Sequence, residues 1–344
     1  MKIGFGLITC QAHPDDSRSE AERYGDAIEQ AVEAERLGFD SVWVSEHHFV
    51  DDGYLPSVLP MCAAIAARTS QITIGTAVVL VPFYEPLRLA EDAATVDLIS
   101  GGRFILGLGQ GWRPEEFDAF NVPPQSRARI LQDTVTVLRQ AWSGGTVSGG
   151  DLLSYPNVAV RPKPVASGSI PIWIGATVER SIRRTGRIAN GFIAGGGLEE
   201  PYTPEEFHDQ LSWINQEREA MDAPGIFTPC MFLPTYASTG HDPWNEVRDY
   251  VYYTYWKYED MAHARSRTEP SKKPPSLSRE RETFLRENGI TGSPEAVAEK
   301  IRRFAKVAGS EFHYIARLYW PGMPRERQRE AMHVFADTVM PLLR

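Results

Sequence analysis

The sequence predicts an α/β fold, a single (β/α)8 TIM barrel with insertions after the fourth and seventh β/α units. Two observations carry this prediction: short apolar segments alternate with segments of helical spacing, and eight such strand segments can be counted. Strands that are apolar at nearly every residue are typical of a parallel sheet buried on both faces. Eight units in 344 residues suggest closure into a barrel. A doubly wound open sheet is the alternative.

The first unit shows the signals used for the later ones. Residues 3–8 are short, apolar and bounded by turn residues, which predicts a buried strand. Residues 19–37 have helical spacing, Ser19 and Glu22 form a capping-box pattern, and Gly38 stands where the helix would end. Further strands are predicted at residues 41–45, 72–79, 104–109, 170–175, 191–194, 226–236 and 312–319.

Helices are predicted between these strands. Thr203 and Glu206 repeat the capping-box pattern, and Ser293-Pro294 opens a helix with proline at its first position. The other predicted helices cover residues 57–68, 86–99, 126–142, 179–189, 204–221, 244–265 and 325–343. Residues 143–169 and the polar, proline-rich residues 268–278 interrupt the alternation as insertions or loops. Since no domain break is visible, we expect residues 1–344 to form one domain.

Charge and composition exclude several classes of protein. The net charge of −9 gives no general electrostatic reason to bind nucleic acid or an anionic membrane. Three cysteines far apart in the sequence argue against a disulfide scaffold and fit a reducing compartment. The first residues do not form a signal-peptide pattern, and no stretch approaches the ~20 apolar residues of a membrane span. We therefore expect a cytoplasmic protein with neither a nucleic-acid nor a membrane partner.

The second predicted strand leads into Glu46, His47 and His48. Two imidazoles and a carboxylate at a strand end fit acid–base work or metal ligation. Because neighbouring strand residues point to opposite faces, joint ligation of one metal ion is disfavoured. Structural hydrogen bonding is the alternative for all three side chains.

A second metal hypothesis concerns the loop after the first strand. Residues 13–16, His-Pro-Asp-Asp, resemble the start of the zinc-binding motif of an amidase family. Ser17 stands where that motif has glutamate, and no His-x-x-His follows to supply further ligands. We read these residues as a polar loop and assign no metal site.

Glycines follow the fourth and sixth strands. The spacing of Gly107, Gly109 and Gly111 is one residue short of the dinucleotide fingerprint, and the motif lies outside the opening β/α unit. Two interpretations stay open for these glycines and for residues 195–197, which begin with Gly195. They admit a flat ligand to the backbone, or they relieve crowding inside the barrel.

Small residues also follow the fifth strand. Gly175, Ala176 and Thr177 precede the helix predicted at residues 179–189, and Ser181 lies in its first turn. Free N–H groups and the helix dipole favour a phosphate at such a position. The alternative is that Thr177 is an ordinary N-cap.

Motifs along nearly the whole chain resemble the bacterial luciferase-like family of flavin-dependent monooxygenases. The resemblance rests on residues 38–49 (GFDSVWVSEHHF), 75–82 (GTAVVLVP), 85–92 (EPLRLAED), 100–104 (SGGRF), 109–111 (GQG), 292–295 (GSPE) and 320–324 (WPGMP). They occur in one order, and each alone is only moderately specific.

The resemblance implies a TIM barrel that binds FMN at the carboxyl ends of its strands. On matching positions, His47 is implied as the catalytic histidine and Glu46 as the residue that supports it. Thr76, Ala77 and Val78 fall where the family holds the flavin ring. In the family, the peptide bond at the position of Ala77-Val78 is often cis and lies beneath that ring. The remaining implied cofactor residues are Gly109, Gln110, Gly175, Ala176, Thr177, Ser181 and Gly195. Gln110 departs from the luciferase pattern, which has an arginine for the phosphate, so backbone N–H groups or another cation must replace it.

The implied reaction transfers oxygen from O₂ to a small organic, apolar substrate, with reduced FMN as cosubstrate. A separate flavin reductase would supply the reduced flavin, and the protein would form a homodimer. A deazaflavin-dependent oxidoreductase on the same fold is one alternative, although those relatives often carry Asp-His where this chain has Glu46 and His47. A non-catalytic flavin-binding subunit is another.

Overall fold

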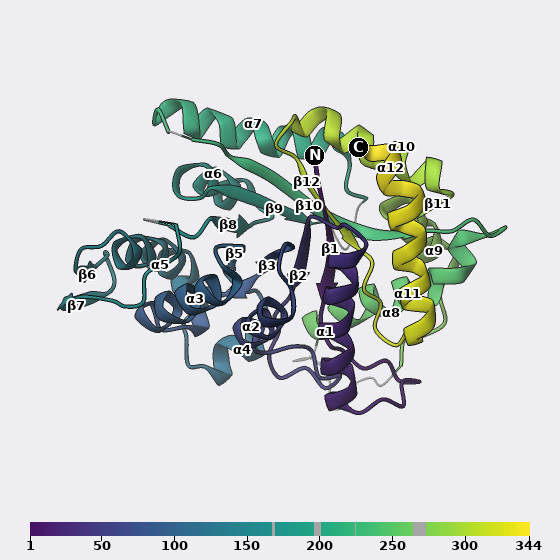
Figure 1. The fold of residues 1–344 in the computed structure, drawn as a ribbon, viewed down its shortest axis with the longest axis horizontal. Helices are drawn as coiled ribbons and strands as arrows, with labels where there is room; N and C mark the ends of the chain where they lie inside the picture. The colour runs from purple at the N-terminus through teal and green to yellow at the C-terminus, as the bar shows by residue number, and fades with distance from the viewer. Residues whose placement is uncertain (167–168, 196–200, 224, 264–272) are drawn as a thin grey trace.

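The computed structural model describes residues 1–166, 169–195, 201–223, 225–263 and 273–344. Eight parallel strands close into a barrel in the order β1-β2-β3-β5-β8-β9-β10-β12, and the last pairs with the first. Figure 1 shows the helices wrapped around this barrel, with the two chain ends near each other. The predicted barrel is confirmed.

The eight barrel strands match the predicted segments within a few residues. They are β1 (Lys2–Ile8), β2 (Ser41–Val44), β3 (Thr73–Thr76), β5 (Phe104–Gly109), β8 (Ile172–Gly175), β9 (Gly191–Gly195), β10 (Thr228–Ala237) and β12 (His313–Arg317). Most of their residues are buried, as expected for a sheet with helices outside and side chains inside.

The barrel helices also lie where helical spacing predicts them. They are α1 (Glu20–Arg36), α2 (Val58–Arg68), α3 (Pro86–Ser100), α5 (Arg127–Trp142), α6 (Glu179–Ile188), α7 (Pro204–Ala220), α10 (Pro294–Ala308), α11 (Arg325–Val334) and α12 (Met340–Leu343). Ser19 forms the complete capping box with Glu22, and Thr203 accepts the N–H of Glu206. A π-helical turn, Phe335–Val339, joins α11 to α12.

Both predicted insertions are present. After the fourth unit, β6 (Val147–Gly149) and β7 (Ser154–Val158) form an antiparallel hairpin that lies beside α5, away from the barrel (Figure 1). After β10, the chain adds α8 (Pro243–Ala262), α9 (Arg279–Asn288) and β11 (Ile290–Gly292) before α10. Residues 268–272 of the loop predicted at 268–278 lie outside the described residues.

Several elements are absent from the sequence prediction. They are the short helix α4 (Pro114–Ala119), the helix α9, and the strands β4 (Val79–Leu80), β6, β7 and β11. Each is short or strongly polar, so it carries little hydrophobic periodicity. Of these, α4 has the largest consequence because it delivers a carboxylate to the candidate site.

The barrel interior is filled by a compact layer of large side chains near its amino end. Trp43 and Trp173 are stacked 5.2 Å apart, and His313 contacts both rings edge-on. The His313 ring shares a 2.7 Å hydrogen bond with Ser41 Oγ. Burial lowers the pKa of His313 to about 3, so this imidazole is neutral. The layer closes the barrel floor and leaves the carboxyl ends of the strands for chemistry.

No described helix combines the length and apolar character that crossing a membrane requires. Cys10, Cys62 and Cys230 are buried and unpaired.

Candidate functional site

His47 lies just past β2 and is held by a carboxylate from another element. Its Nδ1 lies 2.8 Å from Oε1 of Glu116, which is fully buried in α4. A carboxylate only accepts hydrogen bonds, so Nδ1 donates and Nε2 is left to exchange a proton with a bound molecule. Glu116 also accepts the backbone N–H of His48, at 2.9 Å. The carboxylate therefore fixes both the tautomer and the orientation of His47.

Aromatic rings surround the imidazole of His47. Tyr54, Trp112 and Tyr258 pack edge-on against it, with ring centres 4.9, 5.6 and 5.8 Å away. The Tyr54 hydroxyl donates to Ser45 Oγ and lies 2.8 Å from the Tyr258 hydroxyl. Burial raises the pKa of Tyr54 well above its usual value, so its phenol stays protonated. These rings give His47 an apolar environment that ends in a pair of hydroxyl groups.

Glu46, which the resemblance implied as the support of His47, is hydrogen-bonded to other side chains. Its Oε1 accepts from Nε2 of His48, and its Oε2 accepts from the Tyr84 hydroxyl, both at 2.9 Å. Burial raises the pKa of Glu46, while these two donors act in the opposite sense. Within the described residues, the carboxylate bonded to His47 is Glu116. Glu46 therefore braces the neighbouring histidine, because adjacent side chains leave the backbone in different directions.

Sequence reasoning missed Glu116 and the arginine that supports it. Arg113 is buried and donates to the backbone oxygens of His48 and Phe49, which fastens α4 to the segment after β2. A local signal for α4 does exist: Pro114 at the first helical position is followed by two acidic residues in the first turn. That pattern predicts a short helix but not the histidine that it contacts.

The segment Thr76-Ala77-Val78 follows β3, the neighbour of β2, and lines the adjoining part of the barrel mouth. The Ala77–Val78 peptide bond is cis, as the resemblance implies. The Thr76 hydroxyl donates to Gly107 O at 2.8 Å and accepts its N–H at 2.9 Å, so it joins β3 to β5. Val78 remains partly exposed at the end of the segment. The result is a small, uncharged surface in the mouth of the barrel.

Glycines in the neighbouring strands make room for this segment. A Cβ on Gly107 would overlap the Thr76 carbonyl, and one on Gly109 would overlap Val78. A Cβ on Gly175 would come within 3.1 Å of the same valine. Of the two interpretations left open by the sequence, relief of crowding is the one that these contacts favour. These glycines therefore leave room for the segment Thr76-Ala77-Val78.

Relief of crowding also explains the glycine that ends β9. A Cβ on Gly195 would come 2.6 Å from the ring of Phe232. Residues 196–197, the other two glycines of that run, lie outside the described residues.

The predicted phosphate-binding residues meet at the amino end of α6. Val178 occupies the N-cap position and forms no side-chain capping bond, so Thr177 is not the cap. Gln110 reaches across from β5 and donates to Ser181 Oγ at 3.3 Å. Ala176 is partly exposed and Thr177 exposed beside them. An uncapped helix of ten residues presents free N–H groups to an anion.

Helix α8 is tied to the loops that follow β1 and β2. Besides the contact between Tyr258 and Tyr54, the Tyr253 hydroxyl donates to Ala12 O at 2.8 Å. Lys257 forms an ion pair with Asp51. These contacts join segments about two hundred residues apart in the sequence. The insertion after β10 thus forms one wall of the mouth.

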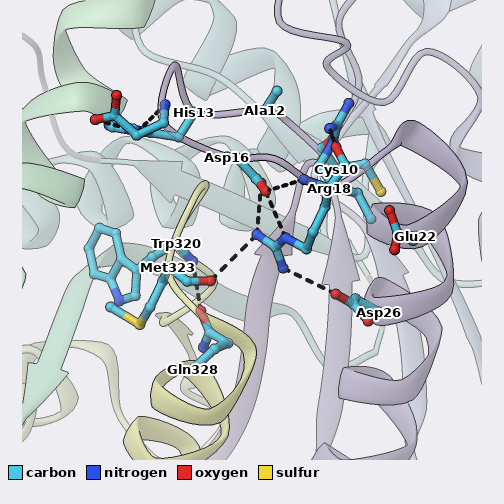
Figure 2. Close-up of polar contacts among 12 residues, drawn as sticks. Cys10, Ala12, His13, Asp16, Arg18, Glu22, Asp26, Trp320, Met323 and Gln328 are labelled. Atoms are coloured by element: carbon cyan, nitrogen blue, oxygen red, sulfur yellow. Dashed lines mark hydrogen bonds and ion pairs between the residues drawn. The ribbon is translucent and has the colours of Figure 1, made fainter.

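The loop after β1 is also tied to the loop after β12, as Figure 2 shows. Arg18 donates to Asp16 and Asp26 and lies 3.4 Å from the Met323 carbonyl oxygen. A Cβ on Gly322 would overlap the side chain of His13. The His-Pro-Asp-Asp loop therefore has a structural place beside the mouth. Within the described part of the chain, no group of three or more His, Cys, Asp or Glu residues is arranged to hold a metal ion.

The chain is similar to curated proteins that depend on a flavin or on F420. The flavin-dependent trigonelline monooxygenase, oxygenase component, of Acinetobacter baylyi is 23% identical over 98% of this chain and 94% of its own. An F420-dependent glucose-6-phosphate dehydrogenase of Microbacterium testaceum is 32% identical over 60% of this chain and 64% of its own. Several other curated relatives are matched over only about half of their length, including the alkanal monooxygenase alpha chain of Aliivibrio fischeri, matched over 40%.

Solved structures share the fold over the whole chain. The monooxygenase RslO1 of Streptomyces bottropensis superposes with a TM-score of 0.81 at 23% identity and covers 99% of both chains. An F420-dependent secondary alcohol dehydrogenase superposes with a TM-score of 0.76 at 19% identity, over 100% of this chain and 99% of the other. The family model described as luciferase-like monooxygenase matches residues 1–311. The chain belongs to the luciferase-like monooxygenase family.

Proposed function

We propose that this protein is an FMN-dependent monooxygenase that acts on a small organic, largely apolar substrate. The observation that carries the proposal is the pair of His47 and Glu116, set among Tyr54, Trp112 and Tyr258. A histidine oriented by a buried carboxylate holds and moves a proton in a place that aromatic rings shield from water.

The residues that follow β3 and β8 fit a flavin. The uncharged segment Thr76-Ala77-Val78 suits the flat ring, and the uncapped start of α6 suits the phosphate. Arg180, exposed in the first turn of α6, is the cation that we propose in place of the arginine absent at Gln110. When bound, reduced FMN supplies the electrons with which molecular oxygen is activated.

The residues of this chain then transfer protons, orient the substrate and exclude water. Glu116 keeps the Nδ1 proton of His47 in place, so Nε2 gives a proton to, or takes one from, the substrate oxygen. The Tyr54 hydroxyl remains protonated, and the hydroxyls of Tyr54 and Tyr258 orient polar groups of the substrate by hydrogen bonds. The helix α8 excludes water from that side.

Reduced flavin would come from a separate reductase, since the trigonelline relative is described as an oxygenase component. The homodimer and the cytoplasmic location remain predictions. A deazaflavin-dependent oxidoreductase is the second candidate, and the F420-dependent relatives at 32% identity favour it. Glu46 and His47, where such relatives often carry Asp-His, favour FMN.

An anaerobic titration with reduced FMN and with reduced F420 tests the cofactor. We expect the protein to bind reduced FMN more tightly, and tighter binding of F420 would overturn the assignment. Isotope-labelled O₂ then tests the reaction, with a panel of apolar carbonyl compounds and with reduced FMN from a generic reductase. Label in an organic product is the expected result. Formation of hydrogen peroxide alone, with every compound of the panel, would contradict the assignment.

Substitution His47→Ala tests the catalytic assignment. We expect oxygen transfer to fall by ~10²–10⁴-fold while FMN still binds. His208→Ala, on the exposed surface of α7, is the matched control and should keep full activity. Full activity of His47→Ala would refute the role of this histidine, and inactivity of every form without a partner chain would favour the subunit alternative.

A further inference from the structure

One cation in the barrel mouth has no anionic partner among the residues that the structure describes. Arg317 ends β12 and is only 8% exposed. Among the described residues, its guanidinium forms neither an ion pair nor a hydrogen bond; the contact it makes is with the ring of Tyr258, 5.4 Å away. A buried arginine is rare unless it is paired, because removing its charge from water is costly. We therefore expect a bound molecule, rather than a residue of the barrel wall, to compensate the charge of Arg317.

The direction of the Arg317 side chain follows from its strand. His313 and Ile315 lie in the barrel interior, where both pack with Trp43. Alternate residues of a strand share a face, so Arg317 also points inward, one level nearer the carboxyl end of the barrel. That level is the mouth in which His47 lies.

Arg317 and His47 flank the same tyrosine. The centre of the Tyr258 ring is 5.4 Å from the guanidinium carbon and 5.8 Å from the centre of the His47 ring. Tyr54 and Tyr255 are close enough for the charge of Arg317 to act on their hydroxyls. A molecule in contact with His47 therefore has an aromatic wall beside it and a planar cation at its far end.

We propose that Arg317 is the specificity-determining residue of this site and binds the carboxylate of a substrate whose remaining body is apolar or aromatic. A guanidinium presents two parallel N–H donors, a geometry that matches a carboxylate. The flavin phosphate has its own proposed place at α6, so the anion at Arg317 belongs to the substrate. The proposal rests on the proposed function only in taking His47 as the reacting end.

The test measures ligand binding without flavin, so its result is independent of the monooxygenase assignment. Calorimetry compares two carboxylates with their neutral amides: benzoate with benzamide, and hexanoate with hexanamide. We expect the protein to prefer at least one carboxylate over its amide by ~10-fold or more, as a charged hydrogen-bonded pair allows. No preference in either pair would overturn the proposal.

Variants then assign the preference to the residue. Arg317→Met should abolish it, and Arg317→Lys should keep only a part, because the ammonium lacks the planar fork. Arg88→Met removes an exposed arginine of α3 and is the matched control; it should retain the full preference. Retention of the preference in Arg317→Met would overturn the proposal. Loss of FMN affinity in that variant with the preference intact would instead place Arg317 against the flavin.

Discussion

Two neighbouring parts of the barrel mouth differ in the polarity of their side chains. The side made by β3, β5 and β8 holds Thr76, Ala77 and Val78 against glycines, and its surface is uncharged. The other side combines His47, Glu116 and a set of tyrosines with a buried cation. We propose that the first side selects a ligand by shape and that the second supplies protons and charge. Substitutions on the two sides should therefore separate cofactor binding from chemistry.

The largest expected effect comes from the polar side. Glu116→Gln keeps the size of the side chain but removes the charge that stabilises a protonated His47. With the best substrate of the carbonyl panel, we expect turnover to fall by a factor on the order of 10². The Kd for FMN should not change, because the substitution leaves Thr76, Ala77, Val78 and the start of α6 untouched.

Glu115→Gln is the control for this change, since its carboxylate lies on the same short helix and pairs with Arg113 instead. Its turnover should stay within about twofold of the wild type. If both variants lose turnover equally, the bond between Glu116 and His47 has no special part in the reaction.

A smaller effect, of the opposite kind, is expected on the uncharged side. The methyl group of Gly109→Ala would press on Val78, and overpacking of this kind costs about 1–3 kcal/mol. We expect urea unfolding to show this loss and the Kd for FMN to rise. Gly145→Ala, where the added Cβ meets nothing within 4 Å, should change stability by less than about 0.5 kcal/mol. Unchanged FMN binding in Gly109→Ala would remove the distinction between the two sides.

The third prediction concerns His313, in the layer of large side chains that closes the barrel floor. His313 keeps a pKa of about 3 in the folded protein, against 6.5 ordinarily. Below pH 6.5 the unfolded chain takes up a proton that the folded one refuses, so stability falls as the pH falls toward 3. The wild type should lose about 1.4 kcal/mol more per pH unit than His313→Gln over this interval. Urea unfolding of both proteins at a series of pH values measures the two slopes, and parallel curves would contradict the neutral, buried imidazole.

The two parts of the mouth also differ in how well the sequence predicts them. The uncharged side follows from local patterns: strand periodicity, glycine runs and the helix after Thr177 all lie close to the residues that they position. The polar side depends on contacts between distant segments. Glu116 is 69 residues from His47, and Tyr258 is 204 residues from Tyr54. Nothing in the periodicity of α4 or α8 indicates which loop each helix will contact, so the sequence predicted the histidine but assigned its support to the adjacent Glu46.

The closure of the barrel has a consequence for the synthesis of the chain. One edge of β1 pairs with β12, which begins more than three hundred residues later. While the chain emerges from the ribosome, this edge stays unpaired until the final strand is made, and unpaired edges invite association with other chains. Arg317 belongs to this final strand, so the polar side is also completed last. A nascent chain that lacks β12 therefore has an incomplete site. Folding depends on contacts of very long sequence separation, and such contacts form slowly.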